Sequence, residues 1–295
     1  MKVFKNDQAL TFLQILVALI SLRFVSCYLL EDYIGMNWLN FFISLLGIIF
    51  IIFAGFFLFK IILQEEFPEK NIIKNTDKAY YYYIGLNALG VVLSFFVADD
   101  LEKTYYFGFY LIIVAALYLY VTQWRKIILF DNIVLAFIIT YPIFLQSCFD
   151  LLPSLEFASQ IQVVSYLFDF AILWFILIWL LYFIRSILLD LINIEFDIKR
   201  GKKTLATKKG REIGAKRTSL LALLPLFLSI YITYLYSSNI LFLIFAAITI
   251  VAPSIYLIIK INHSKSEKDF NTAKNILNII IWFSIISIVT LSFTI

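Results

Sequence analysis

Apolar runs long enough to cross a lipid bilayer recur along the whole chain. A helix needs about 20 predominantly apolar residues to span the hydrocarbon core. The runs of this kind are centred on residues 9–30, 37–60, 80–98, 105–122, 128–147, 163–184, 219–236, 240–259 and 275–294. Polar connections separate them. The pattern predicts an all-α integral membrane protein with nine transmembrane helices.

The basic residues predict the orientation of these helices. Lys and Arg are retained on the cytoplasmic side of a membrane. Of the 24 Lys and Arg residues, all but Arg23 and Lys103 fall in the N-terminal tail or in the second, fourth, sixth and eighth connections. This alternation places the N-terminus in the cytoplasm, and merging or splitting one span would put a basic loop on the wrong side. We expect a multi-pass protein of a bacterial cytoplasmic membrane.

Composition excludes several classes of protein. Hydrophobic residues make up 62% of the chain and charged residues 15%, which excludes a soluble globular protein. Cys27 and Cys148 are too few for a disulfide framework, and His263 is the only histidine, which disfavours a His-based zinc site or a Ser-His-Asp triad. Nucleic acid is not indicated, because neither a recognition fold nor aromatic interleaving accompanies the basic residues.

Two charged residues fall inside predicted spans. A charge at the centre of a transmembrane helix costs roughly 3 kcal/mol on insertion scales. Arg23 and Asp169 both lie toward the outer half of their spans. Either they pair with each other, or each extends its side chain to the membrane surface.

The segment 185–217 is the longest polar stretch, and we expect it to leave the bilayer as a cytoplasmic loop. Asp190, Asn193 and Asp197 fall at i, i+3 and i+7, which places them on one face of a helix. Gly201 is positioned to end that helix. A basic cluster lies around it: Lys199, Arg200, Lys202 and Lys203. Carboxylates beside cations at a membrane surface suggest a magnesium-assisted phosphate site, although topogenic charge and adhesion to anionic lipid also explain the basic residues.

This segment resembles the second aspartate-rich motif of the UbiA superfamily of intramembrane prenyltransferases. The matching residues are Arg185, Asp190, Asp197, Gly201, Thr204 and Leu205, and the departures are Asn193, Phe196 and Ala206. The stretch from Tyr120 to Lys126 is similar to the one that ends the fourth span in that family. The pair Ala54-Gly55 is similar to the pair that precedes the family's first motif.

The first aspartate-rich motif itself is degenerate. Where that family has Asn-Asp-x-x-Asp-x-x-x-Asp, this chain has Phe59 to Phe67, in which apolar residues and Lys60 replace the expected oxygen ligands. Only Glu65 and Glu66 still offer carboxylates. Lys60 would be able to contact a phosphate directly as a point charge.

The resemblance implies one UbiA-like domain over 1–295 around a central cavity, with a first half 1–147 and a second half 148–295 that contains the motif 185–205. It implies Mg²⁺-dependent transfer of a prenyl group from a prenyl diphosphate to an aromatic or lipid-alcohol acceptor. Asp190 and Asp197 would be catalytic and would hold magnesium, with Glu65 as a further carboxylate. The implied substrate-binding residues are Arg185, Asn193, Lys199, Lys203, Lys60, Arg125 and Lys126. The alternative is a catalytically impaired UbiA-fold paralogue that acts as a membrane binding or accessory protein.

Overall fold

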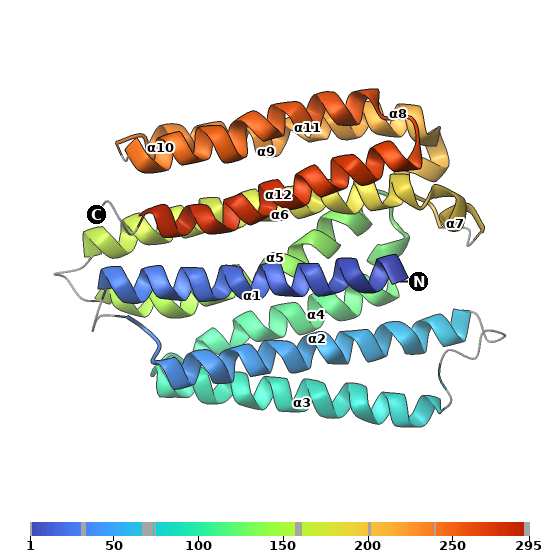
Figure 1. Ribbon diagram of the computed structural model, residues 1–295. Coiled ribbons are helices and arrows are strands. Elements are labelled where there is room, and N and C mark those ends of the chain that lie inside the picture. Colours follow the sequence, from blue (N-terminus) through green and yellow to red (C-terminus); the bar gives the residue numbers. More distant parts are fainter. Residues whose placement is uncertain are drawn as a thin grey trace. The chain divides into compact units, whose positions relative to one another are not determined.

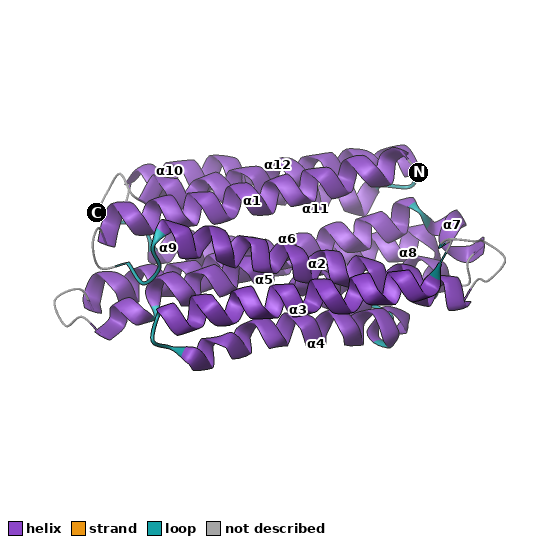
Figure 2. Ribbon diagram, turned by 90° about the horizontal axis from the view of Figure 1, so that it is seen from below, coloured by secondary structure: helices purple, strands orange, loops and turns teal. Residues whose placement is uncertain are grey.

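A computed structural model describes residues 2–30, 34–66, 73, 75–156, 161–199, 202–238 and 240–291. Every regular element of this described part is helical (Figure 2). The α-helices are α1 (Lys2–Leu30), α2 (Trp38–Glu66), α3 (Thr76–Asp100), α4 (Phe107–Thr122), α5 (Phe130–Leu151), α6 (Ile161–Ile192), α7 (Ile194–Lys199), α8 (Leu205–Leu221), α9 (Leu223–Leu235), α10 (Ile240–Ala246), α11 (Ala252–His263) and α12 (Glu267–Leu291). Short 3₁₀ turns cover Thr104–Tyr106, Trp124–Lys126 and Pro153–Glu156, and a π-helical stretch covers Ala247–Val251.

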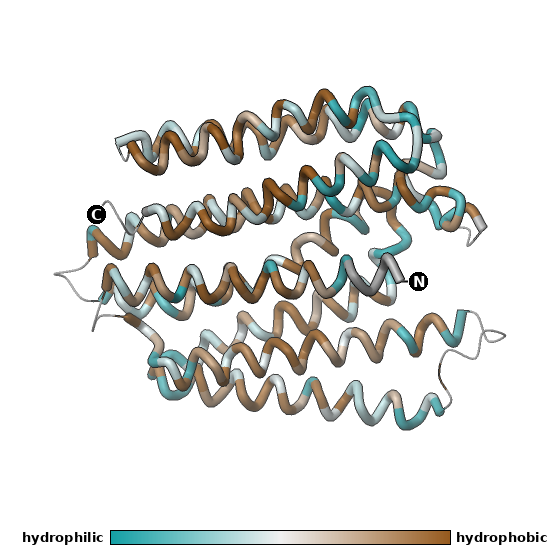
Figure 3. The backbone as a smooth tube through the Cα atoms, viewed as in Figure 1, coloured by the Kyte–Doolittle hydropathy of each residue, from teal (hydrophilic) through white to brown (hydrophobic). Residues whose placement is uncertain are grey.

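The prediction of nine membrane spans is confirmed. Nine helical segments of the described chain are long and apolar enough to cross a bilayer. Helices α8 and α9 together form the seventh of them, and α10, the π-helical stretch and α11 form the eighth. Apolar residues fill the middle of the helices and polar residues gather toward their ends (Figure 3). The cytoplasmic N-terminus, the central cavity and the bacterial membrane stay predictions.

The chain forms two compact units: Met1–Tyr33 with Ile128–Ile295, and Ile34–Ile127. In the larger unit α6 is the central helix, since it packs against α1, α5, α8, α9 and α12 (Figure 1). Buried apolar side chains line most of its length, and Trp174 donates a hydrogen bond from its indole to the carbonyl of Ser284 in α12 at 2.6 Å. Because neighbouring helices hold α6 in place, the polar side chains that it carries near its ends are held in place with it.

The smaller unit consists of α2, α3 and α4. Helices α2 and α3 approach each other closely where Gly47 faces Gly90, because a Cβ atom on Gly90 would lie 2.8 Å from the Gly47 carbonyl oxygen. Small residues allow this approach between membrane helices. Helix α4 joins α2 through a hydrogen bond between the hydroxyls of Ser44 and Tyr110.

The prediction that 185–217 is a loop is wrong for most of its length. Helix α6 continues to Ile192, and α8 begins at Leu205. Thr204 starts α8 with a capping box: its hydroxyl accepts from the Thr207 backbone N–H at 3.1 Å, and the Thr207 hydroxyl accepts from the Thr204 N–H at 2.8 Å. The charged residues from Lys208 to Arg217 lie on this well-capped helix, in which Gly210, with φ of +78°, forms a kink.

The expected single stripe of Asp190, Asn193 and Asp197 is also wrong. The helix breaks at Asn193, so Asp190 lies on α6 and Asp197 on α7. Asn193 donates its side-chain amide to the Leu189 carbonyl at 2.8 Å, and this local bond accompanies the break. Gly201, the expected end of the helix, lies outside the described residues.

Arg23 pairs with Asp150 rather than with Asp169. Both side chains are fully buried, and Gln146 donates to the second Asp150 oxygen at 2.6 Å. Helix α5 extends to Leu151, beyond the predicted end of the fifth span, so that Asp150 stands inside the helix and faces α1. A partner within the protein therefore stabilises this intramembrane charge.

Candidate functional site

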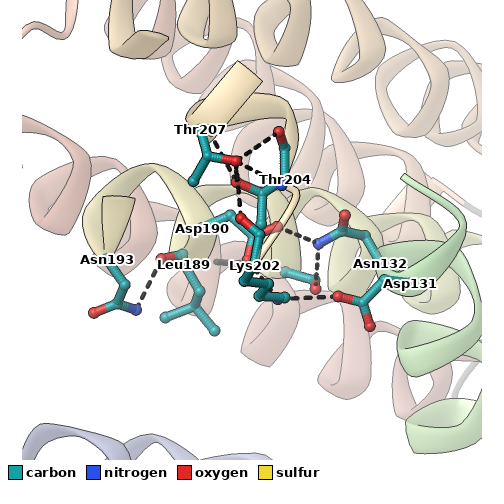
Figure 4. A network of polar contacts seen from close by, with 9 residues as sticks. Asp131, Asn132, Leu189, Asp190, Asn193, Lys202, Thr204 and Thr207 are labelled. Atoms are coloured by element: carbon teal, nitrogen blue, oxygen red, sulfur yellow. Dashed lines mark hydrogen bonds and ion pairs between the residues drawn. The ribbon is translucent and has the colours of Figure 1, made fainter. Parts of the chain in front are cut away.

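A lysine held between two carboxylates lies at one end of the larger unit. Asp131 stands in the first turn of α5, Asp190 near the end of α6, and Lys202 in the connection before α8. The Lys202 Nζ lies 3.0 Å from Asp131 Oδ2 and 3.1 Å from Asp190 Oδ1 (Figure 4). We call these three residues, with Asn132, the Lys202 cluster.

Asn132 fixes the orientation of the Asp190 carboxylate. Its Nδ2 donates to Asp190 Oδ2 at 2.9 Å and to Ser186 Oγ at 2.8 Å. Both oxygens of Asp190 are therefore bonded, one to a cation and the other to an amide. The first turn of α5 and the last turns of α6 are tied together at this point.

The backbone around Lys202 is fixed as well. Its N–H donates to the Asp197 carbonyl at 2.9 Å, and its carbonyl accepts from the Thr207 hydroxyl at 3.0 Å. Thr204, which matches the family motif, forms the cap of α8 with Thr207 (Figure 4). The role of these motif residues in the structure is thus to direct the Lys202 side chain toward α5 and α6.

The charges of the cluster keep the lysine protonated. Asp131 is 6% exposed and Asp190 is 7% exposed. Burial disfavours the ammonium, but the negative charges of Asp190, Asp131 and Asp197 outweigh it and raise the pKa of Lys202 above its ordinary value. Asp131 Oδ1 is buried and has no hydrogen-bond partner among the described residues.

Arg185 belongs to a separate polar network at the same end of the unit. Its guanidinium donates to Thr11 Oγ1 at 2.7 Å and to Asn278 Oδ1 at 2.8 Å, and lies 3.7 Å from Asp7 Oδ1. Lys274 also binds Asp7, at 2.9 Å. These bonds join α1, α6 and α12, so the expected substrate-binding arginine is engaged in helix packing.

A second charged cluster lies in the smaller unit, at the end of α2. Glu66 Oε2 lies 2.6 Å from Arg125 Nη2, and its Oε1 lies 3.0 Å from Lys126 Nζ. We call these three residues the Glu66 cluster. Two of the expected substrate-binding cations are therefore brought together by a carboxylate of the degenerate first motif.

The other predicted residues have separate contacts. Glu65 accepts a hydrogen bond from the Tyr80 hydroxyl at 3.0 Å. The Lys60 ammonium lies over the Phe56 ring, 4.3 Å from its centroid. Lys203 is exposed, and the side chain of Lys199 lies outside the described residues.

The described side chains do not fit a magnesium ion at the Lys202 cluster. Magnesium requires near-octahedral oxygen ligands at about 2.0–2.1 Å. The ammonium of Lys202 lies between the two carboxylates that such an ion would bridge. Within the described ranges no three His, Cys, Asp or Glu side chains form a group that could hold a metal. The chain itself thus places one positive charge between Asp131 and Asp190.

No family model and no curated protein sequence matches the chain. A solved structure of a digeranylgeranylglyceryl phosphate synthase in membranes is similar to it, with a TM-score of 0.65 and 19% identity. The similarity covers 98% of this chain and 99% of that one. The chain has the UbiA fold. The resemblance first noted in the motif 185–205 therefore extends, at the level of the UbiA fold, over all nine spans.

Proposed function

We propose that this protein transfers a prenyl group from a prenyl diphosphate to a hydrophobic acceptor inside the membrane. The observation that supports it most strongly is the UbiA fold over 98% of the chain, shared with a digeranylgeranylglyceryl phosphate synthase. The bond between C1 of the prenyl group and the diphosphate oxygen breaks, and the diphosphate leaves with the electron pair. An acceptor oxygen or ring carbon forms a bond to C1 and loses a proton.

The leaving diphosphate needs cations, and we assign them to the chain. An ammonium has three N–H donors, and Lys202 directs two of them to Asp131 and Asp190. Its side chain is 37% exposed, so the third donor is available to a phosphate oxygen. In the smaller unit, Arg125 and Lys126 together exceed the charge of Glu66 and form a separate candidate for anion binding. A preorganised charge aimed at the leaving group typically contributes about 3 kcal/mol to the lowering of the barrier.

Magnesium, which the resemblance implied, has no step in this proposal because the Lys202 cluster does not fit it. Whether the reaction requires it is a matter for measurement. Turnover with and without a chelator separates a metal-dependent reaction from one that uses the cations of the chain alone.

Purified protein in proteoliposomes, supplied with a radiolabelled prenyl diphosphate, tests the proposal. One reaction contains a hydroxylated aromatic acid as acceptor and another a lipid alcohol. We expect labelled lipid product and released diphosphate with one acceptor class, and a reduction of at least about tenfold in kcat for Lys202→Met. Lys209→Met, which removes an exposed lysine of α8, is the matched control and should retain activity. If neither acceptor class gives product, the proposed reaction is excluded.

A second candidate function is a binding or accessory protein with the UbiA fold. The contacts of the degenerate first motif favour it: Lys60 lies on an aromatic ring, while Glu65 and Glu66 are already bonded to Tyr80 and to the Arg125–Lys126 pair. Such a protein would bind the labelled diphosphate without turning it over. Filter binding of the same ligand, measured beside turnover, distinguishes the two functions.

A further inference from the structure

The chain provides its own cation between two buried carboxylates. We propose that Lys202 takes the position of a divalent metal between Asp131 and Asp190, and that these two carboxylates become a divalent-ion site only when the lysine is removed. This inference concerns the binding chemistry of the site and does not depend on prenyl transfer.

The geometry of the cluster is that of two carboxylates sharing one cation. They come from different helices, α5 and α6, and their oxygens lie 3.0 and 3.1 Å from a single Nζ atom. Two carboxylates more than nine-tenths buried repel each other unless a cation lies between them. An ammonium in this position stabilises both charges, as a metal would.

One carboxylate oxygen of the Lys202 cluster can still act as an acceptor or a metal ligand. Asp131 Oδ1 is buried and accepts no hydrogen bond from any residue that the structure describes, although Asp131 Oδ2 binds Lys202. Asp190 Oδ2 is already bonded to Asn132. A divalent ion requires several oxygen ligands, so a cation that replaced the ammonium would find at least Asp131 Oδ1 as an additional one.

Hydrogen bonds hold the backbone of Lys202 on both sides. Its N–H is bonded to Asp197, its carbonyl to Thr207, and the next helix is capped by Thr204 directly after it. Lys203, one residue later, is exposed. The same bonds therefore select which of two adjacent lysines enters the cluster.

Binding of Mn²⁺ to the full-length protein in detergent, followed by electron paramagnetic resonance, tests the inference. Wild type should show no strong site. Lys202→Met, which keeps an unbranched side chain one atom shorter and removes its charge, should bind one Mn²⁺ at least about tenfold more tightly. Lys203→Met should behave as wild type. The double variant Lys202→Met/Asp131→Asn should lose the gain, which would place the ion at Asp131.

Thermal unfolding gives a second measurement. A ligand that binds only the folded state stabilises it, so Mn²⁺ should raise the melting temperature of Lys202→Met and leave that of wild type unchanged. A wild-type protein that binds one Mn²⁺ as tightly as Lys202→Met would overturn the inference. So would a Lys202→Met protein whose yield and melting temperature do not respond to divalent ions.

Discussion

In the Lys202 cluster two carboxylates share one cation, whereas in the Glu66 cluster two cations share one carboxylate. The first joins Asp190 and Lys202, from the segment that keeps the aspartate-rich motif, to Asp131 of α5, and the second includes the segment in which the motif is degenerate. One lysine lies between the acidic residues of the first cluster, and an excess of positive charge remains in the second. A charge pattern usually divided between protein and metal is thus present within the protein alone.

The two clusters differ in burial as much as in charge. Asp131 and Asp190 are nearly inaccessible, while the side chain of Glu66 is 30% exposed and that of Lys126 is 63% exposed. Exposed ion pairs contribute about 0.2–1 kcal/mol, whereas removing one partner of a buried pair costs about 3–5 kcal/mol. Substitutions of the buried carboxylates in the Lys202 cluster should therefore act mainly on stability, and substitutions in the Glu66 cluster mainly on ligand affinity.

Among these substitutions, Arg185→Met should cause the largest loss of unfolding free energy. Arg185 is buried and loses its bonds to Thr11 and Asn278, although Asp7 keeps Lys274. We expect a loss of about 3 kcal/mol in unfolding free energy, since each bond involves a charged group. Unfolding in mild detergent measures it, and Arg217→Met, on an exposed position of α8, is the control. Unchanged stability with weakened diphosphate binding would instead make Arg185 a ligand-binding residue.

Asp190→Asn should have the next largest effect. Asparagine keeps the shape of the aspartate side chain, but its NH₂ group must face either the Asn132 amide or the Lys202 ammonium. Both of these groups are hydrogen-bond donors, so the NH₂ group finds no acceptor there. We expect a loss of about 2 kcal/mol in unfolding free energy. Glu195→Gln is the control, because the Glu195 side chain is 77% exposed and pairs with Arg211 at 3.4 Å. Equal effects of the two variants would show that the cluster is only a solvated helix end.

The sequence predicted the nine spans but not these partners, and the reason is physical. Span prediction needs only the length of apolar runs, which the bilayer sets. Partner choice depends on which face of a helix a side chain occupies. Asp131 and Asn132 interrupt an apolar run at the start of the fifth span, a signal that was available. The choice of Lys202 over Lys203 was not available, because it depends on the path of the backbone before the capped start of α8.

The candidate site was likewise only partly predictable. Asp190 was identified from the aspartate-rich motif, and Arg125 and Lys126 from the stretch that ends the fourth span. Matching such motifs requires only the spacing of residues along the chain. The break at Asn193 was missed, since apolar residues on both sides of it suggest a continuous helix. The assignment of Arg185 to packing depends on Asn278 and Thr11, which are distant in sequence.

Arg125→Gln changes the Glu66 cluster, the more exposed of the two, and should weaken the binding of the ligand. The substitution removes the excess positive charge of the Glu66 cluster. We expect the KM for a prenyl diphosphate to rise about tenfold, or about 1.4 kcal/mol, with little change in melting temperature. Lys208→Gln, which removes an exposed charge from α8, controls for net charge. A similar rise in both variants would indicate a general electrostatic effect rather than a contact.

Glu66→Gln should act in the opposite direction and less strongly. It releases Arg125 and Lys126 from their shared carboxylate, so an anionic ligand no longer competes with Glu66. We expect the KM to fall about threefold at low salt, and the difference to shrink as salt screens the exposed charge of Lys126. Measurement of KM at two ionic strengths tests this. A rise in KM would mean that Glu66 positions the cations instead of competing for them.

The smallest expected effect is the pH dependence of the Lys202 cluster. The carboxylates around Lys202 raise the pKa of its ammonium above the unfolded value of about 10.4. A group with a raised folded pKa contributes stability that is fully present below the unfolded pKa and is lost as the pH rises through the folded pKa. The difference in melting temperature between wild type and Lys202→Met should therefore stay constant between about pH 6 and about pH 9. A difference that disappears between about pH 7 and about pH 9 would mean that the lysine loses its proton near neutrality, and the neutral amine would then be unable to stand in for a metal ion.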